Sequence, residues 1–167
     1  MSQTLDEIMK KNIALMTACD VVYQQWEHEP ILDFDTDERV GERLGWTATP
    51  TKSLFLSFKS GGHALLLTHK DARLDSKSVK ALMGQRPSIA SNEEMIATLG
   101  CVPGAVCPFG LPEHIPLLVD DTLFGFDTLM YTPGPPEFTF AFAAKDLPVL
   151  LSALPNPIHL IGQPADA

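Results

Sequence analysis

The sequence has no apolar run close to the ~18 residues that a membrane span needs, which argues against an integral membrane protein. It is also poor in cysteine. The three cysteines are an odd number and lie far apart, which predicts free thiols in a reducing compartment rather than a disulfide framework. The first residues lack the basic and apolar segments of a secretory signal. We therefore expect a cytoplasmic protein.

Basic residues are scarce as well, with 12 Lys and Arg against 21 Asp and Glu and a net charge of −9. This balance argues at first against a nucleic-acid partner, because phosphate binding depends on Lys and Arg. The charge is uneven, however. The stretch from Lys52 to Arg86 holds seven basic and two acidic residues, a charge of +5, whereas the rest holds five basic and 19 acidic residues, a charge of −14. The stretch permits a phosphate-bearing partner, although a solvated helix face with scattered lysines explains it equally.

The chain is long enough, at 167 residues, for one domain with its own core, and its patterning predicts a mixed α/β fold. Apolar residues at helical spacing follow capping residues at four places: Thr4, Asp35 or Thr36, Asp75 or Ser76, and Ser91. Strands are expected near 21–23, 115–119, 128–131 and 138–142, with a hairpin over 52–68. A last helix is expected over 144–153. We assign residues 1–154 to a single domain and expect residues 155–167 to form a loose tail.

The segment Gly100–Gly110 holds three glycines and two prolines in eleven residues, which predicts a stiff and unusual backbone. Such a loop can turn several backbone N–H and C=O groups toward a ligand. The alternative is a long structural turn between a helix and a strand. Composition alone favours that alternative.

Several short motifs follow one another along most of the chain. They are His28-Glu29-Pro30, Thr51-Lys52-Ser53-Leu54, Arg73-Leu74-Asp75, Ala90-Ser91, the Gly100–Gly110 loop, Pro116-Leu117-Leu118-Val119-Asp120, and Gly134. In this order, over residues 20–153, they resemble the YbaK family, the free-standing relatives of the editing domain that is inserted in bacterial prolyl-tRNA synthetases. The lysine strand, the Gly-xxx-Pro loop and the Val-Asp strand together make the resemblance fairly specific, whereas each alone would be weak.

The resemblance implies a mixed, partly closed β-sheet flanked by helices, with a small pocket for an aminoacyl group. It also implies trans-editing, which is hydrolysis of the ester that joins a wrong amino acid to a tRNA. The substrate would be tRNA-Pro or another tRNA that carries a small wrong amino acid, bound by its 3′ end. An aminoacyl-tRNA synthetase is a further expected partner. The resemblance implies no cofactor, no metal and no protein nucleophile.

Two residues match the family's catalytic positions. Lys52 would hold the phosphate of the terminal adenosine or position the ester, a role that suits a compact cation with three N–H donors. Gly104 would place and polarise the attacking water through the backbone of its loop. The resemblance assigns the surroundings of the substrate to a further set: His28, Leu54, Ala105, Val106, Cys107, Pro108, Asp120, Thr132 and Gly134.

The sequence departs from the family pattern at two places. Alanine-clearing members carry a His-Pro pair where this chain has Thr132-Pro133, so alanine as the substrate is in doubt. The loop has Ala105 and Cys107 where relatives often have Gly and Ser, which would make the pocket wall more apolar.

Other chemistries remain open at this point. Cys107 could act as a nucleophile activated by a histidine. A zinc site of Cys101, Cys107 and His114 is a weaker alternative, because the spacing fits no standard knuckle. Asp120 could serve the structure by holding the Lys52 strand. The whole protein could also be a binding or regulatory protein that keeps the pocket without turnover.

Overall fold

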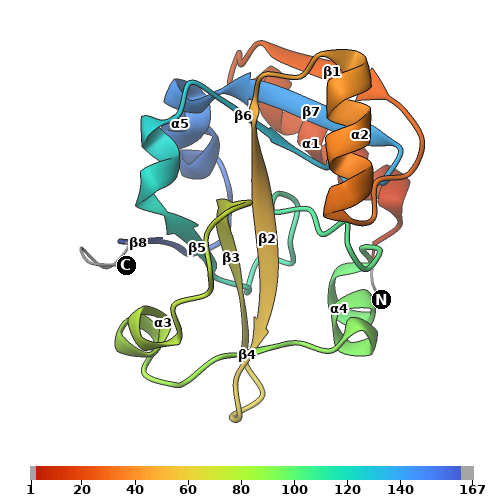
Figure 1. The fold of residues 1–167 in the computed structure, drawn as a ribbon. Helices are drawn as coiled ribbons and strands as arrows, with labels where there is room; N and C mark the ends of the chain where they lie inside the picture. The colour runs from red at the N-terminus through yellow and green to blue at the C-terminus, as the bar shows by residue number, and fades with distance from the viewer. Residues whose placement is uncertain (1–2, 163–167) are drawn as a thin grey trace.

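The structure is a computed structural model that describes residues 3–162 (Figure 1). Its helices are α1 (Leu5–Ala18), α2 (Phe34–Leu44), α3 (Ser76–Met83), α4 (Asn92–Leu99) and α5 (Leu147–Ser152), with short 3-10 helices η1 (Asp121–Gly125) and η2 (Ala144–Asp146). Its strands are β1 (Tyr23–Glu27), β2 (Thr49–Ser57), β3 (His63–His69), β4 (Ser88–Ile89), β5 (Leu117–Asp120), β6 (Thr128–Tyr131), β7 (Phe138–Ala143) and β8 (Ile158–Ile161). No helix within residues 3–162 has the length and apolar character needed to cross a membrane.

The strands form one mixed sheet in the order β1-β7-β6-β2-β3-β5-β8, with β4 paired to the end of β2. Strand β2 joins the two halves of this sheet. It pairs with β6 in parallel over residues 49–50 and with β3 in an antiparallel hairpin over residues 51–57. The predicted mixed sheet flanked by helices is therefore confirmed, and β2 is the strand at which its halves meet.

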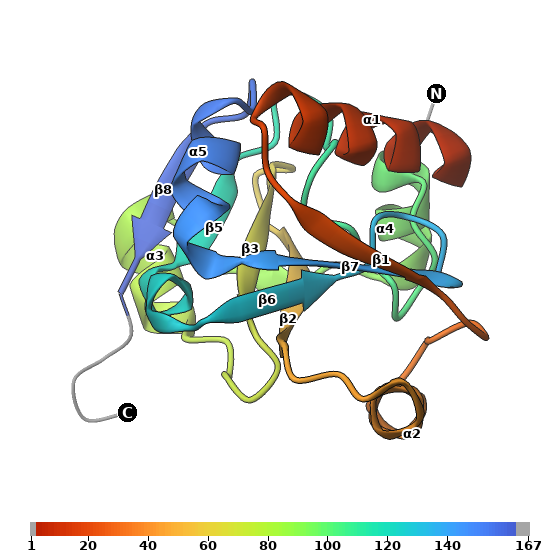
Figure 2. The same cartoon turned by 90° about the horizontal axis from the view of Figure 1, so that it is seen from above.

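Two apolar clusters make up the core. The larger one lies between the sheet and the helices α1, α4 and α5, and α1 contributes Ile8 and Met16 to it. The smaller one lies under α3 and includes Leu56 and Val79. Figure 2 shows α1 and α2 on opposite sides of β1, β7 and β6. Helix α2 buries Val40 alone, so most of its surface takes no part in the core.

Most helices begin and end where the sequence predicts. The side chains of Thr4, Asp75 and Ser91 each accept a hydrogen bond from a first-turn N–H group, and Gly100 ends α4 in a left-handed conformation. Helix α2 is different, because its N-cap is Asp33 rather than Asp35 or Thr36. The Asp33 carboxylate accepts a hydrogen bond from the Thr36 N–H at 2.8 Å. The N-cap therefore lies two residues before the first of the two expected caps.

The first strand begins at the end of the range predicted for it. Val21 and Val22 belong to the turn after α1, where the Val21 N–H donates to the Met16 carbonyl, and pairing with β7 starts at Tyr23. The sequence suggested strand at Val22 because valine favours strands, but this side chain is 86% exposed. The short strand β4 and the helix η1 were not predicted.

The prediction of a loose tail over residues 155–167 is wrong for residues 155–162. Strand β8 pairs in parallel with β5, with Ile158 opposite Leu117 and Ile161 opposite Asp120. The buried side chain of Asn156 fixes the chain ahead of this strand by donating to the carbonyls of Pro112 and Ile115, at 2.8 and 3.0 Å. Residues 155–162 therefore belong to the folded unit, and residues 163–167 lie outside the described part.

This arrangement predicts that Asn156→Ala destabilises the protein by about 1–3 kcal/mol, because two buried carbonyls lose their donor. Asn92→Ala, at an exposed position in the first turn of α4, is the matched control and should change stability by less than about 0.5 kcal/mol. Urea unfolding of the two variants measures the difference. Equal stabilities would contradict a stabilising role for the two hydrogen bonds of Asn156.

Candidate active site

A cavity of about 350 Å³ opens where β2, β6, the start of α2 and the Gly-rich loop meet. Its volume lies at the small end of the range for sites that bind small molecules. The residues that line it come from four segments and one further strand position: 31–34 and 37, 50–54, 104–106, 130–132, and 139. The cavity therefore draws on segments that are far apart in the sequence.

The cavity exists because β2 and β6 diverge soon after they meet. Their parallel pairing covers residues 49–50, and the Thr51 hydroxyl then donates to the Met130 carbonyl at 2.9 Å. Beyond this bond, residues 52–54 form one wall and residues 131–132 contribute to another. The cavity thus lies where β2 and β6 stop pairing, and residues of both strands line it.

Lys52 lies on this wall with its side chain half-buried. Its ammonium group donates a hydrogen bond to the Ala72 carbonyl. Burial lowers the pKa of Lys52, and the charge of Asp71 partly opposes that shift. An ammonium has three N–H donors, and Ala72 is the acceptor that the structure shows for it among residues 3–162. Lys52 therefore keeps donors for a ligand in the cavity.

Asp120 supports the Lys52 strand from outside the cavity. Its buried carboxylate accepts hydrogen bonds from the Thr68 hydroxyl at 2.6 Å and from the backbone N–H and hydroxyl of Thr122. Thr68 is the residue that pairs with Lys52 across the β2–β3 hairpin. The structure thus places Asp120 behind the strand and at the cap of η1, rather than in the cavity lining.

The Gly-rich loop enters the cavity through a tight turn. The Ala105 N–H donates to the Val102 carbonyl at 2.9 Å, and Gly104 has φ +86°. A type II turn requires a positive φ at its third position and commonly has proline at its second, and Gly104 and Pro103 occupy these two positions. A Cβ atom at Gly104 would overlap the carbonyl oxygen of Leu32. Gly104 is thus required both by its backbone conformation and by its contact with the segment before α2.

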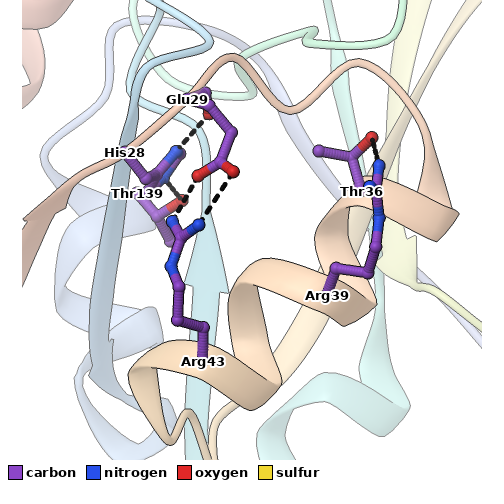
Figure 3. A network of polar contacts seen from close by, with 6 residues as sticks. All are labelled: His28, Glu29, Thr36, Arg39, Arg43 and Thr139. Carbon is purple, nitrogen blue, oxygen red and sulfur yellow. Dashed lines mark hydrogen bonds and ion pairs between the residues drawn. The ribbon is translucent and has the colours of Figure 1, made fainter.

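The segment before α2 is held against the residues that lead into β7. The N–H groups of His28 and Ile31 donate to the carbonyls of Glu137 and Pro136. The Nδ1 atom of His28 lies 2.7 Å from the Glu29 carbonyl, which can only accept, so Nδ1 carries the proton. In the neutral ring, Nε2 then accepts from the Thr139 hydroxyl at 2.8 Å (Figure 3). His28 lies outside the cavity lining and orients Thr139, which belongs to it.

The same segment is tied to α2 by an ion pair, shown in Figure 3. The two terminal nitrogens of the Arg43 guanidinium group donate to the carboxylate of Glu29. This two-fold hydrogen bond lowers the pKa of Glu29 to about 2. Trp46 adds an apolar contact, because the centroid of its ring lies 5.4 Å from the centroid of the Trp26 ring. The end of α2 is thereby fixed to β1 and to the segment that precedes the helix.

A buried asparagine that the sequence did not single out fixes the rest of the Gly-rich loop. Asn12 of α1 is fully buried and donates to the carbonyls of Ile8 and Phe109, at 2.8 and 3.0 Å. It also donates to the Cys107 sulfur at 3.4 Å and accepts from the Tyr131 hydroxyl at 2.8 Å. An isolated asparagine in an amphipathic helix gives no signal of such a role. Asn12 therefore connects α1, the loop and the cavity residue Tyr131.

Cys107 lies behind the cavity rather than in its lining. The side chain is 1% exposed, and its thiol donates to the Phe109 carbonyl at 3.2 Å. Burial raises the pKa of Cys107 well above its ordinary value, which suppresses the thiolate that a nucleophile requires. The structure therefore argues against the alternative of a cysteine nucleophile.

The other residues expected around the substrate divide into two groups. Among them, the cavity lining includes Lys52, Leu54, Gly104, Ala105, Val106 and Thr132. Pro108 lies outside it, as does Gly134, where an added Cβ atom would lie 3.0 Å from the Leu5 carbonyl oxygen of α1. Within residues 3–162 there is no group of three or more His, Cys, Asp or Glu placed to hold a metal ion. His114 is exposed, so the zinc alternative has no support in the geometry.

The basic stretch extends from the cavity toward α3. Lys70 follows β3 and forms an ion pair with Glu38 of α2 at 3.7 Å. Arg73, Lys77 and Lys80 are exposed on the loop after β3 and on α3, which lies beside the lower part of β3 and β5 in Figure 1. The positive charge therefore lies on the side of the molecule that adjoins Lys52.

The chain belongs to the aminoacyl-tRNA editing domain family, whose model matches residues 34–149. The match runs from α2 to α5 and includes both Lys52 and the Gly104 turn. The resemblance to the YbaK-like editing domains is therefore confirmed.

Similar proteins and structures agree with this membership. The chain is 30% identical over 128 residues to the multifunctional Ser/Thr-tRNA deacylase ProXp-y of Escherichia coli strain K12, which covers 73% of this chain and 75% of that protein. It is 27% identical over 131 residues to the uncharacterized protein YwhH of Bacillus subtilis strain 168, covering 75% and 83% of the two chains. Among solved structures, a candidate trans-editing enzyme for prolyl-tRNA synthetase has a TM-score of 0.70 at 19% identity over 94% of this chain and 98% of its own. The hypothetical protein APE2540 has a TM-score of 0.75 at 21% identity, over 90% and 98%.

The contact between Gly104 and Leu32 predicts that Gly104→Ala destabilises the protein by more than the cost of a positive φ alone. Gly61→Ala is the matched control, because Gly61 also has a positive φ, at +96°, but nothing lies within 4 Å of an added Cβ. We expect a loss of about 1–2 kcal/mol for Gly61→Ala, and a larger loss for Gly104→Ala. Urea unfolding of both variants measures this, and equal losses would contradict the close packing of the turn.

Proposed function

We propose that this protein is an aminoacyl-tRNA deacylase that hydrolyses the ester of mischarged tRNA in trans. One observation carries the proposal: Lys52 and the Gly104–Val106 backbone line the same cavity, from two different walls. A cation and a glycine-containing turn at one small site suit an ester that is joined to a phosphate-bearing chain. Membership of the aminoacyl-tRNA editing domain family supports the same reading.

In the proposed reaction, the oxygen of a water molecule forms a bond to the ester carbonyl carbon, and the bond from that carbon to the ribose oxygen breaks. The proton of the water ends on the ribose oxygen, which leaves a free amino acid and an uncharged tRNA. Backbone dipoles of the turn at Gly104 stabilise the developing charge and place the water, since preorganised dipoles act most strongly at the transition state. The Lys52 ammonium binds the phosphate of the terminal nucleotide and so positions the ester.

The side chains that line the cavity favour a small amino acid with a hydroxyl group as the one that is hydrolysed from the tRNA. Five side chains with a hydroxyl group line it: Thr51, Ser53, Tyr131, Thr132 and Thr139. Thr132 stands where the sequence suggested that alanine recognition is lost, and the name of the E. coli relative refers to serine and threonine. We therefore favour seryl and threonyl esters over alanyl esters. The tRNA-Pro acceptor, a synthetase partner and a cytoplasmic location stay predictions.

A deacylation screen tests this proposal. Purified protein is mixed with tRNAs that carry serine, threonine, alanine, cysteine or proline, and the loss of each ester is followed over time. We expect the seryl or threonyl ester to be lost fastest. Lys52→Ala should reduce that rate by about 100-fold or more, because the ester is no longer positioned.

Lys10→Ala is the matched control, since Lys10 is exposed on α1 and the substitution removes the same charge. It should leave the rate unchanged. Circular dichroism of both variants excludes unfolding as the cause. Full activity in Lys52→Ala would contradict the role of the lysine. No hydrolysis of any ester by the unchanged protein would favour the alternative of a binding or regulatory protein.

A further inference from the structure

A carboxylate that the sequence did not single out also lines the cavity. Three charged side chains take part in the lining: Asp33, Asp37 and Lys52. Asp33 caps α2 and accepts from the Thr36 N–H, and Lys52 donates to the Ala72 carbonyl. Both of these groups therefore have protein partners.

Asp37 differs from them in its surroundings. It lies one turn into α2, is half-buried, and its carboxylate has no hydrogen bond or ion pair from any residue in the described range 3–162. Burial raises the pKa of Asp37, while the charges of Lys70 and His28 oppose the shift and that of Glu38 adds to it. Lys70 itself is paired with Glu38. A partly desolvated carboxylate without a partner gains most from a cationic ligand group.

The substrate class proposed above carries such a group. An aminoacyl ester has a free α-ammonium next to its carbonyl, whereas peptidyl and formylated esters have a neutral amide at that place. Lys52 on β2 and Asp37 on α2 line different walls of the cavity, with the Gly104 turn on a further one. The 3′ end of an aminoacyl-tRNA can therefore present its ester carbonyl to the turn, the phosphate of its terminal nucleotide to the lysine and its α-ammonium to the carboxylate.

We propose that Asp37 binds the α-ammonium group of the aminoacyl ester and thereby restricts the site to esters with a free amino group. This inference rests on the proposed function and names the feature of the substrate that the site reads. It gives the protein a means of sparing peptidyl-tRNA, whose ester is the same but whose nitrogen is acylated.

The kinetic test compares seryl-tRNA with N-acetyl-seryl-tRNA. We expect the unchanged protein to hydrolyse the free amine form about 10- to 100-fold faster, in line with the strength of a hydrogen-bonded charge pair. Asp37→Asn should slow seryl-tRNA hydrolysis by a similar factor and leave the N-acetyl form unchanged, so that the preference disappears. Asp35→Asn is the matched control, because Asp35 is exposed on the same turn and outside the cavity lining. A preference that persists in Asp37→Asn would overturn the proposal.

A binding test separates this inference from the proposed activity. The probes are the 5′-monophosphate of 3′-deoxy-3′-(L-serylamino)adenosine, which has an amide in place of the ester, and its analogue with an α-hydroxyl in place of the ammonium. These two probes have the same size and differ in charge. Calorimetry should show tighter binding of the ammonium form by about 10-fold or more, and Asp37→Asn should abolish the difference. Equal affinities, or no binding of either probe, would overturn the role of Asp37. Selective binding without hydrolysis would refute the proposed activity alone.

Discussion

The close approach of Gly104 to the Leu32 carbonyl is the contact on which the site depends. It brings the Gly-rich loop, which follows α4, against the segment that leads into α2. A type II turn with glycine at its third position makes this approach sterically possible. The opening between β2 and β6 has a third wall because of this contact. Any side chain at Gly104 would push the loop and the segment before α2 apart.

Two polar networks support the two sides of that contact. Behind the loop, Asn12 satisfies backbone and side-chain groups that would otherwise be buried without partners. On the other side, His28 and the Glu29–Arg43 pair fix the segment before α2 to β7 and to the last turn of α2. Neither network touches the cavity directly, except through Tyr131 and Thr139. The lining is therefore held by residues whose function is positional.

The fold places basic and acidic residues on different sides of the cavity. The chain is acidic as a whole, yet its basic stretch runs from the cavity wall at Lys52 along the hairpin to α3. Two carboxylates, Asp33 and Asp37, in contrast line the cavity from the start of α2. The site therefore has a positive side suited to phosphates and a negative side suited to an ammonium. An overall negative charge does not oppose this arrangement, because screening limits distant charges at physiological salt.

The local features of the fold could be predicted from the sequence, and the long-range ones could not. Caps such as Thr4 and Ser91 act within one turn, so their signal lies in four consecutive residues. Strand β8 was missed because it is stabilised by the partner strand β5 and by Asn156, which bonds to carbonyls more than forty residues away. The resemblance supplied Lys52 and the Gly104 loop, but not Asn12 or Asp37. Those two acquire their roles only when α1 and α2 pack on opposite sides of the sheet.

The central claim is that the Gly104 turn and Lys52 bind one aminoacyl-adenosine group together. An NMR titration of the 15N-labelled protein with the 5′-monophosphate of 3′-deoxy-3′-(L-serylamino)adenosine tests it most directly, because this probe carries the phosphate proposed for Lys52 and each backbone amide reports separately. The account predicts that the largest shift changes occur at residues 52–54 and 104–106, with small changes at the hairpin turn around Gly61. Changes confined to α3 and the hairpin turn, with residues 104–106 unaffected, would contradict the account.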